Sequence, residues 1–547
     1  MKKALIIGNS NYIGFDRLKN PGNDANAISE ILAYKGFETE VYFDQTSNDM
    51  RSTFDDFVKR VNDGDHIFYF YAGHAIEFRD SNYLLSVDLG CGSVEHNCLT
   101  IDYIQNQLNR VNKKGVKLLV IDACRNNNFA FEAKGLKKEE SNLNTLIAFS
   151  TSPGSAAKDG KNELSYYTKY LIDNIKKYNI SINDIFRNVR ESVIESTKFE
   201  QIPWEHSSLT SEFSFENIFV PTKLEQISKL TYKQCYSIKN IGDGFLLGGN
   251  GADLYKYVKG EHPQRRLRTE KENDNFAIEE IDCNQSLVVF IDSEDFLVFL
   301  DKRELKVVAH VNVGFTPYTV SINNDKVFVA GSGDVAKLYD LSSNTVEVID
   351  LEDGILKEIY SNDDVLEHKS RSLTIMCSTF AEEKTNILAF GGSDSIFFVK
   401  DILTGEELLC NKNRDLFTYT YSISFSNDGK YIATGHDEGK VLIWDARHFT
   451  LLKVIGENNK ILKNQFFEFK NEKISNDIMH LKFSNNSKFL GVGTSESKVM
   501  FFDVEYNEKI NEIDLNVEPL AINSFDFDSS DESLLVSIND KSYEFKI

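Results

Sequence analysis

The sequence has few cysteines, comparatively few basic residues and no long apolar run. Its seven cysteines are scattered through 547 residues without a Cys-x-x-Cys pair, so neither a disulfide framework nor a zinc ribbon is expected. No apolar run approaches the roughly 18 residues that a membrane helix needs, and residues 1–7 lack the apolar core of a cleavable leader. These absences predict a cytoplasmic protein.

Acidic side chains outnumber basic ones by 84 to 61, which gives a net charge of −23. Because nucleic acids attract basic surfaces, direct binding to nucleic acid is not expected. Residues 222–547 hold 54 of the acidic and 36 of the basic side chains, so most of the negative charge lies there. Such a surface either keeps a large β-rich domain soluble or steers basic partners toward it.

The chain is too long for one core and changes character near residue 221. Before that point, strand-like apolar runs alternate with amphipathic helical runs, which predicts an α/β fold with a mostly parallel sheet flanked by helices. The expected strands occupy residues 3–8, 37–43, 66–71, 116–121 and 146–150. We expect a first domain over residues 1–215, a linker over 216–223 and a second domain over 224–547.

The second domain consists of short strands punctuated by Gly, Asn, Asp and Ser. Seven similar runs end near residues 258, 301, 340, 401, 445, 503 and 546. Four of the six spacings are 39 to 44 residues and the others are 61 and 58, close to the roughly 40–45 residues of one propeller blade. Residues 426–445, which end in Val-Leu-Ile-Trp-Asp, resemble the Trp-Asp (WD) repeat, and residues 484–503 are a second copy. An all-β seven-bladed propeller is therefore expected, with residues 224–232 supplying the outer strand of the last blade.

Two reactive side chains follow strands of the first domain. His74 comes after Tyr71-Ala-Gly, and Cys124 comes after Asp122-Ala. Because the carboxyl ends of parallel strands line a common crevice, the two side chains are expected to meet if the strands are neighbours. A free cysteine is only a few per cent ionised at neutral pH, and a nearby imidazolium stabilises its thiolate. The pair therefore indicates nucleophilic catalysis.

These motifs, together with residues 4–12, 20–28, 148–154 and 201–209, occur in the order found in the caspase and metacaspase superfamily, which residues 1–215 resemble. The resemblance implies a three-layer caspase-like fold and a cysteine endopeptidase with His74 and Cys124 as catalytic residues. It also implies that the backbone amides of Cys124 and of Gly73 or Ala75 stabilise the oxyanion. Most relatives have Gly where this chain has Ala75. If the backbone at this position had a positive φ, the methyl group of alanine would destabilise it by roughly 1 kcal/mol or more.

The resemblance extends to substrate choice. Metacaspases and paracaspases bind a basic P1 residue with acidic side chains, and the matching positions here are Asp24 and Asp122. Two carboxylates can bind a guanidinium in bidentate fashion, so cleavage after Arg is expected first and after Lys second. Asp24 has a second interpretation, because Asp is also favoured as a cap at the start of a helix.

Other features of the first domain carry weaker signals. The basic residues Lys134, Lys137 and Lys138 form either a solvated loop or a self-cleavage site. Cys91, His96 and Cys98 are interpreted as loop residues, because three ligands without a fourth do not make a zinc site. No phosphate-binding glycine loop and no EF-hand loop occurs. No metal or other cofactor is therefore expected, although a calcium requirement stays open.

Two functions are compatible with these patterns. The first is an intracellular Arg/Lys-directed cysteine peptidase whose propeller binds a protein or peptide as a sensor or docking module. Fusions of this kind in bacteria resemble signal-triggered proteases of stress or antiviral defence. The alternative is an inactive caspase-like scaffold that serves as a platform for protein interactions.

Overall fold

The computed structural model describes most of the chain as two compact units, Met1–Ile218 and Phe219–Ile547, which are taken separately below. The residues outside this description are 15–16, 79–80, 90–93, 95–97, 125–141, 153–163, 178–179, 212, 216–221, 228–233, 251–252, 260, 262, 269–276, 334, 351–373, 383–385, 395, 411–417, 456–466, 469–475, 507, 516–519 and 540.

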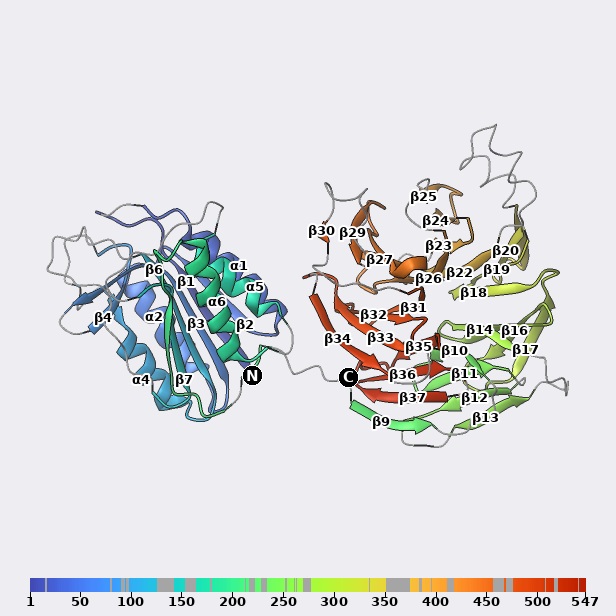
Figure 1. Ribbon diagram of the computed structural model, residues 1–547, viewed down its shortest axis with the longest axis horizontal. Helices are drawn as coiled ribbons and strands as arrows, with labels where there is room; N and C mark the ends of the chain where they lie inside the picture. The colour runs from blue at the N-terminus through green and yellow to red at the C-terminus, as the bar shows by residue number, and fades with distance from the viewer. Residues whose placement is uncertain are drawn as a thin grey trace. The chain divides into compact units, whose positions relative to one another are not determined.

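The first unit is built on a sheet with the strand order β2-β1-β3-β6-β7-β8 (Figure 1). The pairs from β2 to β7 are parallel, and β8 is antiparallel to β7. Two further strands, β4 and β5, extend from β3 in antiparallel fashion. The strands are β1 (Lys2–Gly8), β2 (Glu38–Phe43), β3 (His66–Phe78), β4 (Ser81–Leu85), β5 (Cys98–Thr100), β6 (Lys117–Cys124), β7 (Thr145–Phe149) and β8 (Trp204–Ser207).

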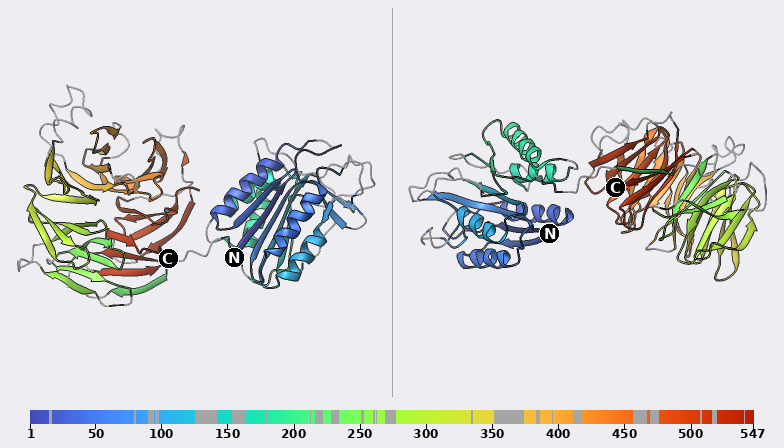
Figure 2. Two further views of the ribbon diagram at one scale, coloured as in Figure 1. Left: turned by 180° about the vertical axis from the view of Figure 1, so that it is seen from behind. Right: turned by 90° about the horizontal axis from the view of Figure 1, so that it is seen from below.

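Helices cover both faces of this sheet (Figure 2). Helices α2 and α4 pack on the face that carries Leu5 and Tyr69, while α5 contacts both α1 and α6 on the opposite face. The α2, α4, α5 and α6 helices each begin after a Ser or Thr whose hydroxyl accepts a backbone N–H bond. The helices are α1 (Pro21–Tyr34), α2 (Ser47–Lys59), α4 (Ile101–Val111), α5 (Tyr166–Ile175) and α6 (Ile182–Ser196). The expected three-layer α/β fold is confirmed. None of the described helices is long and apolar enough to cross a bilayer.

The second unit consists of seven sheets, each a blade of a propeller (Figure 1), whose strands pair in antiparallel fashion except for the parallel pair β29–β30. The inner strands of consecutive blades contact one another, and the inner strand of the seventh contacts that of the first. The ring therefore closes with seven blades, as the repeat spacing predicts. The fifth blade carries an additional short strand, β30. The short helix η2 (Asp437–Gly439) lies between its second and third strands.

The first three blades are β10 (Cys235–Asn240), β11 (Phe245–Gly249), β12 (Asp253–Tyr257) and β13 (Gln264–Arg268); β14 (Ile278–Cys283), β15 (Leu287–Asp292), β16 (Phe296–Asp301) and β17 (Val307–Asn312); and β18 (Pro317–Asn323), β19 (Lys326–Gly331), β20 (Val335–Asp340) and β21 (Thr345–Asp350). The fourth and fifth are β22 (Ile375–Phe380), β23 (Ile387–Gly392), β24 (Phe397–Asp401) and β25 (Glu407–Cys410); and β26 (Thr420–Phe425), β27 (Tyr431–His436), β28 (Val441–Asp445), β29 (Leu451–Ile455) and β30 (Phe467–Glu468). The last two are β31 (Ile478–Phe483), β32 (Phe489–Thr494), β33 (Lys498–Asp503) and β34 (Glu508–Asp514); and β35 (Ile522–Phe527), β36 (Ser533–Ile538), β37 (Lys541–Lys546) and β9 (Thr222–Ile227).

The seventh blade combines strands from the two ends of the propeller sequence. Strand β9 pairs in antiparallel fashion with β37, and Ile227 lies opposite Ser542. The sequence predicts this strand at residues 224–232; in the structure it spans Thr222–Ile227, and residues 228–232 lie outside the described part of the chain. Because β9 covers the free side of β37, the seventh blade has its full complement of four strands.

Neighbouring blades are also joined by side-chain hydrogen bonds between their inner strands. The Ile281 amide donates to Ser237 Oγ at 3.0 Å, and the Leu481 amide donates to Ser422 Oγ at 2.9 Å. At the closing junction the Asn240 amide donates to Asp526 Oδ2 at 2.9 Å. Polar side chains that face the channel therefore help to hold the ring together.

Candidate active site

His74 and Cys124 occupy paired positions on neighbouring strands. Strands β3 and β6 are parallel, and His74 is the register partner of Cys124. Since paired strands lie about 4.8 Å apart, the two backbones are adjacent at this point. His74 is buried, with 3% of its surface exposed. The structure therefore brings the two predicted catalytic positions together.

Strand β3 does not end at His74, which differs from the expectation of a strand that stops near Tyr71. It continues to Phe78, but it changes its partner: His74 is the last residue paired with β6, and Ala75 is the first paired with β4. The added pairing with β4 stabilises this extension. His74 thus lies inside a continuous strand, at the point where one ladder gives way to another.

Two tyrosines supply hydrogen bonds to the backbone of His74 at this change of partner. The His74 amide donates to Tyr12 Oη at 2.8 Å, and the two tyrosine oxygens are 3.0 Å apart. Tyr71 Oη lies 2.8 Å from the carbonyl oxygens of both His74 and Leu85. Burial raises the pKa of Tyr71 well above its ordinary value, so its hydroxyl stays protonated. The His74 backbone is therefore held by one pair of phenols, and the single hydroxyl proton of Tyr71 is shared between the carbonyls of His74 and Leu85.

Gly73 allows the tyrosines to approach. Its φ is +157°, and a Cβ atom there would lie 2.4 Å from Tyr12 Oη and 2.7 Å from Tyr71 Oη. Ala75, in contrast, is not among the described residues with positive φ. The strain considered for the methyl group at position 75 therefore does not arise.

Gly73→Ala is expected to reduce both stability and any activity that depends on His74. The new methyl group must displace the tyrosine pair, which we expect to cost about 1–3 kcal/mol and to lower turnover of an Arg-ending peptide at least about tenfold. Thermal unfolding and kcat/KM measure the two effects. Gly22→Ala is the control, because the nearest atom to its Cβ would be 3.8 Å away. If Gly73→Ala kept both the thermal stability and the kcat/KM of the wild type, the proposed role of Gly73 in admitting the two tyrosines would be wrong.

The two acidic candidates for substrate binding meet at the start of α5. Asp24 and Asp122 are buried, with 2% and 6% of their surfaces exposed. The Ser165 amide donates to Asp24 Oδ1 at 2.9 Å, and Ser165 Oγ donates to Asp122 Oδ2 at 2.5 Å. Asp122 Oδ2 also accepts from Thr168 Oγ1 at 2.9 Å. One serine therefore contacts both carboxylates.

The interpretation of Asp24 as a helix cap is wrong. Helix α1 begins at Pro21 with Asn20 as its N-cap, so Asp24 lies within the first turn and its side chain bonds to Ser165 instead. Sequence reasoning missed Ser165 and Thr168. Ser165 is the N-cap of α5 and accepts a bond from the Thr168 amide. A Ser that directly precedes a helical run, as Ser165 precedes Tyr166–Ile175, is the signal that could have identified the cap.

Further polar groups lie beyond the end of β7. Ser150 and Thr151 each have 1% of their surface exposed, and within the described residues neither hydroxyl has a hydrogen-bond partner. Trp204 of β8 stacks on Phe149 with ring centroids 5.1 Å apart. Gln201 fixes the loop after β7, because its Nε2 donates to the Ser150 carbonyl at 2.7 Å. Since β7 pairs with β6, these polar groups follow the strand next to the one that ends at Cys124.

Several predicted residues lie outside the described part of the chain. They are the self-cleavage candidates Lys134, Lys137 and Lys138, together with Cys91 and His96; of Cys124 the structure describes only the backbone. The interpretation of Cys98 as a loop residue is wrong, because it is the first residue of β5; it is buried there, and burial raises the pKa of its thiol to about 12. Its sulfur therefore stays protonated at neutral pH. Among the described residues, no cluster of three or more His, Cys, Asp or Glu side chains is arranged to hold a metal.

The parallel sheet, the paired His74 and Cys124 positions and the ring of seven blades define an α/β domain of caspase type followed by a β-propeller. In agreement with this, residues 1–214 match the model of the caspase domain family, and the first unit is a caspase domain. Residues 406–545 match a propeller family described as the N-terminal domain of nucleolar protein 10-like proteins.

Two curated proteins are similar to part of the chain. The mucosa-associated lymphoid tissue lymphoma translocation protein 1 of Homo sapiens is 31% identical over 129 residues, and its Mus musculus homologue is 30% identical over the same length. The match covers 23% of this chain and only 15% of either relative. The similarity therefore concerns one segment, and the relatives are much longer than the region they share with this chain.

Proposed function

We propose that the first unit is a cytoplasmic cysteine endopeptidase that cleaves after Arg, with Lys second, and that the propeller is its sensor or docking module. The observation that carries this proposal is the pairing of His74 with Cys124 on β3 and β6. The caspase-domain match over residues 1–214 supports a peptidase. By analogy with bacterial fusions of this kind, such a protein would act in stress or antiviral defence.

The proposed reaction uses the two side chains in sequence. His74 takes the proton of the Cys124 thiol, and the thiolate forms a C–S bond with the scissile carbonyl carbon. The backbone amides of Cys124 and of Gly73 or Ala75 stabilise the oxyanion. His74 then gives its proton to the leaving amine as the C–N bond breaks. Water, which loses a proton to His74, attacks the thioester carbon, the C–S bond breaks, and the Cys124 sulfur takes the proton back from His74. The His74 amide is bonded to Tyr12 and therefore does not act as an oxyanion donor.

Asp24 and Asp122 account for the proposed preference at P1. Both carboxylates are buried, and both are held at the start of α5 through Ser165. A buried carboxylate pair attracts a guanidinium or ammonium group and repels an acidic side chain. Arg is preferred over Lys because its planar guanidinium can bond two carboxylates at once.

A panel of fluorogenic peptides ending in Arg, Lys, Asp or Leu tests the proposal. We expect kcat/KM for Arg to exceed that for Asp and Leu by about 100-fold or more, because the two carboxylates repel an acidic P1 side chain and form no charge-assisted hydrogen bond with an apolar one. Each peptide is assayed with and without calcium, since the requirement for this ion is open. Cleavage after Asp that is faster than cleavage after Arg would contradict the proposed specificity.

A further inference from the structure

All seven inner strands of the propeller carry a β-bulge at the same place. In each of β10, β14, β18, β22, β26, β31 and β35, the pairing with the next strand shifts after the first residue, so that the second residue is extra. A bulge re-aims the side chain of its extra residue. Because the bulge recurs in every blade, the seven extra residues form one ring.

The members of this bulge ring are large and suited to contact with a protein. Five of the seven are Tyr or Met, namely Tyr236, Tyr318, Tyr421, Met376 and Met479. Tyr318 is 44% exposed. The ring of Tyr419, which is 38% exposed, stacks on that of Tyr421 with the ring centroids 5.7 Å apart. Tyr and Met are enriched where proteins bind one another, and Tyr rings also attract cations.

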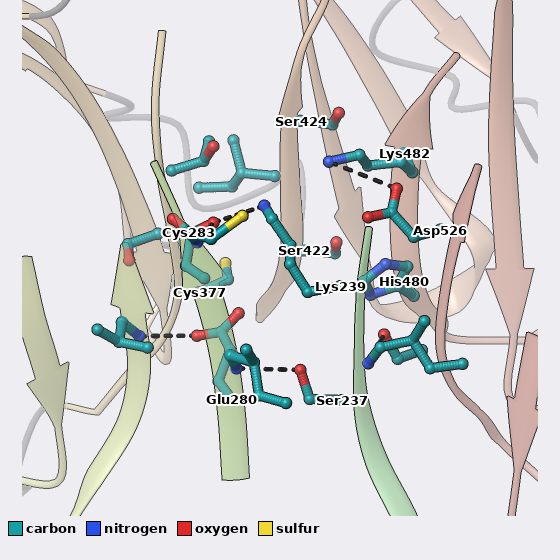
Figure 3. A pocket seen from close by; sticks show the side chains of 18 of the residues that line it. Ser237, Lys239, Glu280, Cys283, Cys377, Ser422, Ser424, His480, Lys482 and Asp526 are labelled. Carbon is teal, nitrogen blue, oxygen red and sulfur yellow. Dashed lines mark hydrogen bonds and ion pairs between the residues drawn. The ribbon is translucent and has the colours of Figure 1, made fainter. Parts of the chain in front are cut away.

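The bulge ring lines a cavity in the middle of the propeller. The cavity has a volume of about 610 Å³ and is lined by residues of all seven inner strands, a size within the roughly 300–1,000 Å³ range of ligand pockets. Figure 3 shows side chains from several blades facing one another across it. The remaining two ring members, Glu279 and Asn523, also line this space.

The lysines in the cavity are already paired. Lys239 Nζ lies 2.5 Å from Asp282 Oδ1, and Lys482 Nζ lies 3.7 Å from Asp526 Oδ1 (Figure 3). Lys302 donates to the Asn284 carbonyl at 2.7 Å. His480 adds no charge at neutral pH, because burial lowers its pKa to about 4. The cationic groups of the lining are therefore committed to neighbours in the protein.

Two adjacent carboxylates on β14, those of Glu279 and Glu280, differ from these lysines because burial disfavours their charged forms. Glu280 Oε2 accepts the Val320 amide at 2.7 Å. Burial raises the pKa of Glu280 to about 7, although the bonds from Val320 and Thr319 and the charge of Lys239 act in the opposite direction. Burial, with the nearby charge of Asp292, also raises the pKa of Glu279. Five acidic and three basic residues line the cavity. A cation that enters from the bulge ring would compensate the charge of both glutamates.

We propose that the bulge ring binds a basic segment of a partner protein, and that a Lys or Arg side chain of this segment enters the cavity toward Glu279 and Glu280. The charge of the domain supports this choice, since residues 222–547 carry 54 acidic and 36 basic side chains. The inference rests on the proposed docking role of the propeller but not on peptidase activity.

The test measures the binding of labelled decapeptide pools to the full chain carrying Cys124→Ala, so that basic peptides are not cleaved. Each pool is random apart from a central residue fixed as Arg, Lys, Gln or Glu. We expect the Arg and Lys pools to bind at least about tenfold more tightly than the Gln and Glu pools, and Glu279→Gln with Glu280→Gln to remove this difference. Gln at position 280 can still accept the Val320 amide, and thermal unfolding verifies the fold.

Two control variants assign the binding to the channel. Glu304→Gln makes the same kind of substitution and removes one negative charge from an exposed side chain outside the cavity; it should leave the preference unchanged. Asp122→Asn weakens any binding to the peptidase unit alone. The proposal is overturned if no pool binds at millimolar concentration, if all pools bind equally, or if the preference survives the double substitution and disappears with Asp122→Asn. These results do not depend on turnover, so they separate this proposal from the proposed cleavage reaction.

Discussion

Cys124→Ala is expected to lower kcat/KM for an Arg-ending peptide by about 10⁴-fold or more, because the alanine side chain cannot attack the carbonyl carbon. His74→Ala should have an effect of similar size, and the double variant should be little worse than either single variant. This non-additivity is expected because the two residues act as a unit: His74 has no thiol to deprotonate without Cys124, and Cys124 is not activated without His74. Turnover of the Arg peptide under the same conditions measures all three variants.

The control for this pair is Cys410→Ala, which makes the same change on β25 of the propeller. Its turnover should match that of the wild type. If Cys124→Ala kept full turnover, the cleavage would belong to another group. If the wild type cleaved nothing and Cys124→Ala kept the cellular function of the protein, the scaffold alternative would hold.

Asp122→Asn is expected to reduce kcat/KM for Arg peptides by about 100-fold or more, with a smaller loss for Leu peptides, because the charge that pairs with the P1 group is removed. The amide oxygen of Asn can still accept from Ser165 and Thr168, which contact Asp122 Oδ2. Asp24→Asn should act in the same direction, and the ratio of Arg to Leu turnover reports the effect of each variant.

Ser165→Ala separates substrate binding from structural support. This variant removes the hydroxyl bond to Asp122 and the cap of α5 but leaves both carboxylate charges in place. We expect it to lower stability by about 0.5–2 kcal/mol while keeping the order of P1 preference. If Ser165→Ala changed the preference as strongly as Asp122→Asn, or if Asp122→Asn left it intact, the acidic pocket would be the wrong explanation.

Local sequence patterns were sufficient for most of the architecture. Apolar runs predicted β1, β2, β6 and β7 to within a few residues, and the repeat spacing predicted all seven blades although one unit alone carries Trp-Asp. In that unit the Trp444 indole donates to Thr434 Oγ1 at 3.0 Å, and the His436 ring nitrogen Nε2 lies 2.7 Å from the same oxygen. The Trp-Asp signature thus adds hydrogen bonds within its own blade, and blades without it can still form.

The features that the sequence did not predict depend on contacts between distant residues. Tyr12 and Tyr71 meet across 59 positions, and Ser165 reaches Asp24 across 141. The extension of β3 past His74 depends on β4, which has no strong strand pattern of its own. The bulge ring becomes visible only when the seven inner strands are compared in one register, because neither Tyr236 nor Met376 belongs to a recognisable sequence motif by itself.

The junction of β9 with β37 has a consequence for the order in which the protein folds during synthesis. The paired residues Ile227 and Ser542 are separated by more than three hundred positions, whereas every other strand pair of the propeller is local in sequence. Contacts over such separations form slowly, because a long loop must close before they are made. The caspase domain can therefore complete its core while the ribosome is still translating the blades, and ring closure should be the last and slowest step. Until β37 emerges, β9 has no partner within the ring.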